Sequence, residues 1–129
     1  MSERLLSPRL EDIIEAIERI RHVLDGVALE AFEQDWEKRW LVERGIEIIS
    51  EASRHLDDDL KTRRSEIPWS KVAAIGNVLR HAYDHVAADV LWKLARVDLS
   101  ALHQVCRDEL AIALAREREA DDRDGKFDG

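Results

Sequence analysis

The chain has 129 residues, of which 45% are hydrophobic and 37% are charged, with five glycines and two prolines. This length suits one domain with its own core, and the many helix-forming residues with few chain breakers predict helices. The net charge is −8, from 20 basic and 28 acidic residues. That balance argues against a protein that coats nucleic acid over a broad surface, so any contact with RNA must be local.

The expected cellular location rests on two patterns that the sequence does not show. It has no run of about 18 apolar residues that could span a membrane, and its first residues do not form a signal-peptide pattern. Cys106, the sole cysteine, lies among apolar residues and is expected to be a small core residue without a disulfide. We therefore expect a cytoplasmic protein that makes no membrane contact.

The first half of the chain predicts two long helical stretches. The first begins at Ser7-Pro8, with serine as the N-cap and proline at the first helical position, and ends at Asp25-Gly26. The second runs from about residue 29 to residue 56, and Gly45 within it suggests the close approach of another helix. Its predicted buried stripe comprises Phe32, Trp36, Trp40, Ile46, Ile49, Ser53 and Leu56.

The second half begins with a predicted polar loop at residues 57–66, after which Ile67-Pro68-Trp69 opens a helix. Another helix is predicted at about 86–96, with Val90, Leu91 and Leu94 facing inward, and Asp98 is expected to cap a last helix. We predict a single helical domain over residues 1–115 and a frayed or disordered acidic tail over 116–129. No strand-type alternation is present, so the predicted fold is an all-α antiparallel bundle of about five or six helices.

Residues 76–85 concentrate the groups that could perform chemistry. His81 and His85 are four residues apart and would share a helical face that could hold a metal. Two ligands do not make a site, and no other histidine or cysteine has a helpful spacing, so hydrogen-bonded or solvated histidines are the favoured interpretation. We expect no metal and no other cofactor.

Acid–base chemistry on RNA is a second interpretation of this segment. RNA carries its own nucleophile, the 2′-hydroxyl, so cleavage needs a base, an acid and a cation for the developing phosphate charge. His81 and Arg80 supply an imidazole and a guanidinium, and in general an imidazole titrates near neutrality whereas a guanidinium stays charged. The alternative is that both residues form only a polar helix end, with cations near the negative end of the helix dipole. For the four tryptophans, packing in the core or in a dimer is favoured over base stacking.

Four segments in order resemble the HepT-like toxins of the HEPN superfamily. Ile67-Pro68-Trp69 and Gly76 to Tyr83 resemble that family's I-P-W and R-N-x-x-x-H-x-Y motifs. The stretch from Ile46 to Ala52 resembles its L-E-I-I-G-E-A, and residues 90–92 and 98–102 resemble its V-W and D-L-P-x-L segments. The similarity covers residues 10–110 and implies a HEPN-like helical bundle.

The resemblance also implies a function. Members are typically homodimers that cut RNA without metal, using motifs that meet in a cleft between the subunits. They are commonly paired with an MntA-like nucleotidyltransferase antitoxin that transfers AMP to the motif tyrosine. His81 would then be the catalytic histidine, Asn77 the polar residue after the motif arginine, and Tyr83 the site of modification. The substrate would be an RNA, such as tRNA or mRNA.

Gly76 departs from this pattern because it stands where the family has its motif arginine. Arg80 could supply the missing charge, which is the assignment we prefer because His81-Ala82-Tyr83 keeps the family's H-x-Y. Alternatively, Arg80 and His85 form a shifted motif, since their spacing also fits the superfamily. A third interpretation is a catalytically inactive binding partner of a nucleotidyltransferase.

Overall fold

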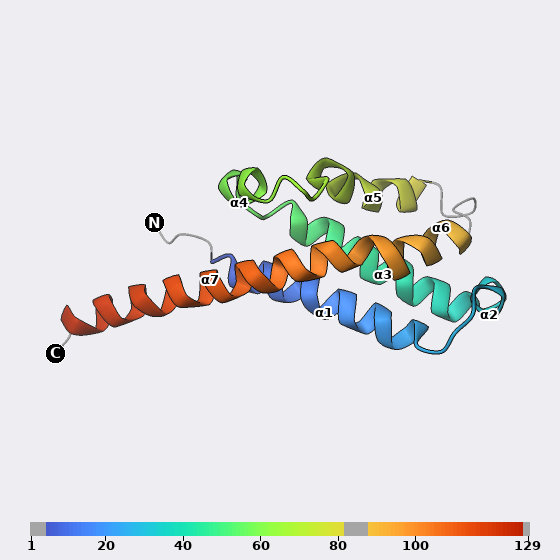
Figure 1. Cartoon of the computed structure of the whole chain (residues 1–129), viewed down its shortest axis with the longest axis horizontal. Helices are drawn as coiled ribbons and strands as arrows, with labels where there is room; N and C mark the ends of the chain where they lie inside the picture. The colour runs from blue at the N-terminus through green and yellow to red at the C-terminus, as the bar shows by residue number, and fades with distance from the viewer. Residues whose placement is uncertain (1–4, 82–87, 128–129) are drawn as a thin grey trace.

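The computed structural model describes the backbone of residues 5–81 and 88–127, and the side chains of residues 5–79 and 88–123. Every element in these ranges is helical. The long helices α1 (Ser7–Leu24), α3 (Trp36–Ser53), α5 (Trp69–His81) and α7 (Leu99–Phe127) run alternately in opposite directions (Figure 1). α3 packs between α1 and α5, and α1 also packs against α7. The predicted all-α antiparallel bundle is confirmed.

α1 contributes one continuous face to the core. Its side chains Leu10, Ile13, Ile17 and Ile20 are at most 2% exposed, as the three- and four-residue spacing predicts. The predicted N-cap is wrong by one residue. Leu6 occupies that position, and Ser7 lies inside the helix, where its hydroxyl donates to a carboxylate oxygen of Glu117 at 2.8 Å. Gly26 ends the helix region with a φ of +70°, a conformation that favours glycine.

The predicted long helix over residues 29–56 is two helices, α2 (Leu29–Glu33) and α3. Asp35 separates them and caps α3, because its side chain accepts a hydrogen bond from the backbone N–H of Lys38 at 3.1 Å. Within α3, Trp36 and Trp40 lie six residues, roughly 120° around the helix, from Val42 and Ile46 respectively. Val42, Ile46 and Ile49 are buried, whereas Trp36 and Trp40 are 54% and 66% exposed. The prediction that these two tryptophans are buried is wrong.

The predicted loop at residues 57–66 contains a short helix, α4 (Asp58–Arg63), which Asp57 caps by accepting from the N–H of Leu60 at 2.9 Å. α5 then starts after Pro68. The indole N–H of Trp69 donates to the carbonyl of Arg64 at 2.9 Å, so the start of α5 is joined to the end of α4.

The last part of the chain comprises α6 (Ala88–Lys93), a π-helical turn η1 (Leu94–Asp98) and α7. Leu91 is buried as predicted, but Val90 is 53% exposed. Asp98 ends η1, and the chain continues into α7 without a break. α7 also continues as a helix to Phe127, where the sequence led us to expect a frayed tail. The division of the chain at residue 115 stays a prediction.

Among the described residues, no helix is long and apolar enough to cross a membrane.

Candidate functional site

The predicted motif lies at the C-terminal end of α5. Asn77 is an exposed residue of this helix, and the backbones of Arg80 and His81 form its last turn. The side chains of Arg80 and His81, and the whole of Tyr83 and His85, lie outside the described residues. The proposed roles of these residues therefore rest on the motif and on the helix that carries it.

Gly76 lies in the closest contact between α5 and α3. Its backbone N–H donates to the hydroxyl oxygen of Ser50 at 3.3 Å, and this hydroxyl donates in turn to the carbonyl of Ala73 at 2.8 Å. A Cβ atom at residue 76 would lie only 2.8 Å from the Ser50 Oγ and 3.1 Å from its Cβ. We call this contact of Ser50 with Ala73 and Gly76 the α3–α5 seam. A side chain at residue 76 would displace the Ser50 hydroxyl from its present position, and glycine permits this close approach.

The side of α5 that carries the motif shares one exposed face with α3. A helix turns about 100° per residue, so Asn77 and the backbone of His81 lie roughly 100° and 140° around α5 from Gly76. Glu51 lies roughly 100° around α3 from Ser50. Because the two helices run in opposite directions, both displacements lead to the same side of the pair. Asn77 and Glu51 are exposed on this side.

Two ion pairs near the seam involve this part of α3. The Nη2 of Arg54 donates to the carbonyl of Ala73 at 2.7 Å, while its Nη1 lies 3.3 Å from Glu51. Further towards the N-terminus of α3, Arg44 lies 3.4 Å from Glu47. These charges lie along α3 and its C-terminal cap between residues 44 and 54.

Glu43 and Arg39 lie one and two helical turns beyond Glu47. Burial raises the pKa of the Glu43 carboxyl above its ordinary value; Arg39 opposes this rise, and Glu47 adds to it. Among the described side chains, Arg39 has a buried Nε with no hydrogen-bond acceptor. A buried donor without a partner is uncommon in folded proteins and is a candidate contact for a bound acceptor.

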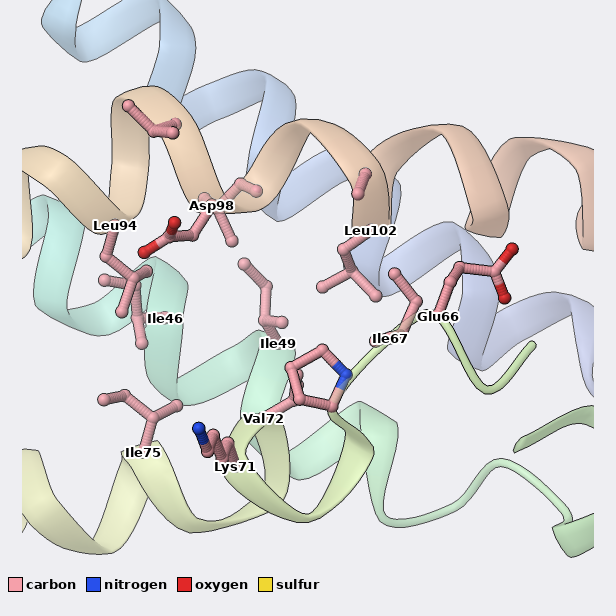
Figure 2. A pocket seen from close by; sticks show the side chains of 14 residues that line it. Ile46, Ile49, Glu66, Ile67, Lys71, Val72, Ile75, Leu94, Asp98 and Leu102 are labelled. Atoms are coloured by element: carbon pink, nitrogen blue, oxygen red, sulfur yellow. The ribbon is translucent and has the colours of Figure 1, made fainter. Parts of the chain in front are cut away.

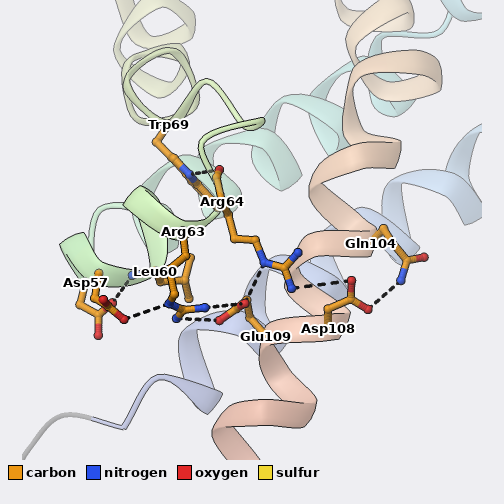
Figure 3. A network of polar contacts seen from close by, with 9 residues as sticks. Asp57, Leu60, Arg63, Arg64, Trp69, Gln104, Asp108 and Glu109 are labelled. Atoms are coloured by element: carbon orange, nitrogen blue, oxygen red, sulfur yellow. Dashed lines mark hydrogen bonds and ion pairs between the residues drawn. The ribbon is translucent and has the colours of Figure 1, made fainter.

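A second polar cluster connects α4 to α7 and lies away from the seam. The two terminal nitrogens of Arg63 donate to the two carboxylate oxygens of Glu109, each at 3.0 Å, and Arg64 Nε donates to the same carboxylate at 2.8 Å (Figure 3). The Glu109 side chain is only 2% exposed. Burial alone would raise its pKa, but hydrogen bonds from both arginines outweigh burial and hold the pKa below its ordinary value. This complete charge compensation indicates a structural role, which is to fix the segment that leads into α5.

A cavity of about 580 Å³ opens between α3, α5, η1 and the start of α7. Its wall is apolar, with Ile46, Ile49 and Val72 in the middle and the charged groups of Lys71 and Asp98 nearby (Figure 2). No histidine or arginine is among the described residues that line it. The groups that RNA cleavage needs are therefore absent from this wall, and the exposed face at the end of α5 remains the better candidate site.

Sequence reasoning missed Ser50 and the exposure of the two tryptophans. Ser50 stands where the family's L-E-I-I-G-E-A motif has its glycine, and its sequence context did not single it out. A serine in the helix before Gly76 could have suggested a polar contact. For the tryptophans, the available signal was their spacing, because Trp36 and Trp40 precede Val42 and Ile46 by six residues, roughly 120° out of register on a helix. The expectation for Cys106 is confirmed. It is fully buried, and burial raises its thiol pKa to about 12.

Comparison with known proteins identifies the family. A model of the ribonuclease HepT-like family matches residues 13–109. A protein named probable ribonuclease HepT from Thermococcus cleftensis is 41% identical over 72% of this chain and 84% of its own length. A protein from Methanocaldococcus jannaschii with a provisional RNase name is 29% identical over 77% of this chain and 91% of its own length. No solved structure gives a significant match. On the family match and the relative at 41% identity, the chain belongs to the ribonuclease HepT-like family.

Proposed function

We propose that this protein is a metal-independent RNA endonuclease and the toxin of a type II/VII-like toxin–antitoxin pair. The observation that carries the proposal is the family match over residues 13–109, a range whose sequence retains the His81-Ala82-Tyr83 of the motif. Named ribonuclease relatives support the activity. The small exposed face at the end of α5 is compatible with an acidic protein that contacts RNA locally.

The chemistry needs only side chains and the RNA itself. A histidine accepts the proton of the 2′-hydroxyl, whose oxygen attacks the adjacent phosphorus. The bond from phosphorus to the 5′-oxygen breaks, and that oxygen receives a proton from an acid, leaving a 2′,3′-cyclic phosphate and a 5′-hydroxyl. His81 acts as base or acid, and Arg80 stabilises the charge on the phosphate oxygens. Asn77 contributes a further polar side chain from the same helix.

A homodimer completes this scheme, because a twofold axis brings two copies of one short motif together. One His81 can then act as the base and the other as the acid. The proposed partner is an MntA-like nucleotidyltransferase antitoxin that transfers AMP to Tyr83. The added nucleotide would place a bulky anion two residues from His81 and so block the approach of RNA. The toxin, its antitoxin and a tRNA or mRNA substrate would meet in the cytoplasm.

The α3–α5 seam favours a second candidate function. The motif arginine is absent, and a side chain at residue 76 would have to displace Ser50, against which Gly76 is packed. A protein that has lost its phosphate-binding arginine could serve as a catalytically inactive binding partner of the nucleotidyltransferase. In that case it would form the complex but would not cleave RNA.

The test is RNA cleavage by protein purified without an antitoxin and confirmed by mass to carry no AMP. Cellular RNA is incubated in EDTA with the native protein, with His81→Ala and with His22→Ala, a matched control for an exposed histidine on α1. We expect the native protein and His22→Ala to cleave, and His81→Ala to be inactive while its circular dichroism is unchanged. Arg80→Ala should lower the rate roughly 100-fold or more. Cleavage that survives in His81→Ala would refute the assignment of this residue, and no cleavage by the native protein would favour the binding-partner function.

A further inference from the structure

Trp36 and Trp40 form an exposed aromatic pair at the start of α3. Their side chains are 54% and 66% exposed, and their rings contact edge to face with centroids 5.0 Å apart. Exposed tryptophans that already hold each other in place offer a rigid apolar surface at low entropic cost, which is typical of binding sites. The sequence favoured a packing role for these residues, but within the described structure most of each side chain faces solvent.

This pair lies on the same face as the end of α5. The α3–α5 seam joins Ser50 to Gly76, so in an antiparallel pair the backbone of His81 is level with about residue 45 of α3. Trp40 then lies roughly 8 Å further along the axis of α3, at 1.5 Å per residue. It is also roughly 80° around α3 from Ser50, on the side that carries Glu51 and, on α5, Asn77. A strand that crosses the end of α5 can therefore continue over Trp40.

Only a few positive charges near Trp36 and Trp40 could contact a phosphate backbone. Lys38, Arg39 and Arg44 lie within two helical turns of the tryptophans, and the buried Nε of Arg39 has no acceptor. Arg44 is 71% exposed and makes one long contact with Glu47 at 3.4 Å. Acidic residues are interspersed with these cations, so the surface has no strong positive potential. Affinity for a strand must then come mainly from stacking rather than from charge.

We propose that Trp36 and Trp40 form a stacking platform for unpaired bases of a single-stranded RNA whose phosphate lies at the end of α5. This inference rests on the proposed function and specifies the substrate class as single-stranded RNA. Tryptophan stacks on any base, so the platform selects unpaired bases over duplex rather than a particular sequence. The acidic surroundings disfavour electrostatic binding to the regular phosphate array of a duplex.

The binding test uses a short, fluorescently labelled single-stranded oligonucleotide of 2′-deoxy residues, which lacks the nucleophile and cannot be cleaved by this mechanism. Fluorescence anisotropy measures its Kd for the native protein, Trp40→Ala, Trp36→Ala and Leu41→Ala. Leu41 is a matched control, because it is 57% exposed but lies on the opposite side of α3 from the seam. We expect Trp40→Ala to weaken binding about tenfold, Trp40→Phe to retain most of the affinity, and Leu41→Ala to bind like the native protein.

A second probe isolates stacking. An abasic oligonucleotide of the same length should bind the native protein and Trp40→Ala equally weakly, and a duplex should bind more weakly than the single strand. Binding that is unchanged in Trp40→Ala would overturn the proposal. The same Kd combined with a changed molecular mass in sedimentation, or with changed binding of the nucleotidyltransferase, would also overturn it. The two tryptophans would then form a protein interface.

The binding test of the stacking platform and the cleavage test of the proposed function can fail independently of each other. Tryptophan-dependent binding by a protein that cleaves no RNA would retain the platform and refute the nuclease. Cleavage with native kinetic constants in Trp36→Ala and Trp40→Ala would retain the nuclease and refute the platform. If both proposals hold, Trp40→Ala raises KM for single-stranded RNA and leaves kcat nearly unchanged, since stacking on a distant base stabilises the ground state and the transition state alike.

Discussion

A methyl group at residue 76 tests the α3–α5 seam directly. Its carbon would lie 2.8 Å from the Ser50 Oγ and 3.1 Å from the Ser50 Cβ. Alanine in place of glycine gains about 1 kcal/mol of helix propensity. Overpacking a close contact costs about 1–3 kcal/mol, and moving the Ser50 hydroxyl away from the carbonyl of Ala73 loses about 1 kcal/mol more. We therefore expect Gly76→Ala to lower the free energy of unfolding by about 1–3 kcal/mol.

The assay is urea denaturation followed by circular dichroism, applied to Gly76→Ala, Ser50→Gly and the double variant. Ser50→Gly removes both atoms that the new methyl group would meet, so the cost of Gly76→Ala should be smaller in that background. Ala74→Gly, at an exposed position of the same helix, measures the propensity difference alone. A Gly76→Ala protein that is as stable as the native protein would refute the close contact.

The same contact predicts the effect of restoring the family's arginine. Gly76→Arg should destabilise the protein more than Gly76→Ala, because a longer side chain meets the same atoms. It should not increase the rate of RNA cleavage. A stable and more active Gly76→Arg protein would show that residue 76 can face the substrate.

Three further predictions concern parts of the fold that support the site. Glu109→Gln should lower the free energy of unfolding by about 2 kcal/mol at neutral pH. This loss is smaller than for a fully buried ion pair, because the Arg63 side chain is 37% exposed. Since the folded pKa of Glu109 lies below its ordinary value of 4.5, this stabilisation is present above that pH and is lost as the pH falls through the lowered pKa. Chemical denaturation at several pH values measures it, and a difference that grows as the pH falls would contradict the role of Glu109. Cys106, with a thiol pKa of about 12, should react with a thiol reagent only after unfolding; rapid reaction of the folded protein would refute its burial. Asp35→Ala should lower the thermal midpoint by removing the cap of α3, whereas Asp35→Asn should retain most of it, and equal loss in both would point to the ion pair with Lys38 instead.

The sequence was sufficient to predict the fold class, because helical spacing of apolar residues was strong in α1 and in the second half of α3. It failed at Trp36 and Trp40 for a specific reason. Trp36 and Trp40 follow Phe32 at four-residue steps, but they lie six residues, roughly 120° around α3, from Val42 and Ile46 respectively. α3 therefore buries Val42 and Ile46 and exposes the two tryptophans. Short capped elements such as α2 and α4 have too few turns for periodicity to reveal them.

For the site, the sequence predicted the segment from Gly76 to His85, and the roles of its residues stay a prediction. The structure places the backbone of His81 in the last turn of α5 and explains the packing of Gly76. One sequence does not establish that Gly76 faces Ser50, since the two residues are 26 positions apart and lie in different helices. The exposed aromatic pair was equally hidden, because exposure depends on which side of α3 the neighbouring helices cover.

The most direct test of the central claim is the chemistry of the product ends. An RNA oligonucleotide is incubated with the native protein in EDTA, and the fragments are analysed by mass spectrometry. Attack by the 2′-hydroxyl predicts fragments that end in a 2′,3′-cyclic phosphate and begin with a 5′-hydroxyl, and a single 2′-deoxy residue at the cleavage position should prevent the cut. Fragments with a 3′-hydroxyl and a 5′-phosphate, or cleavage that needs a divalent metal, would contradict the account.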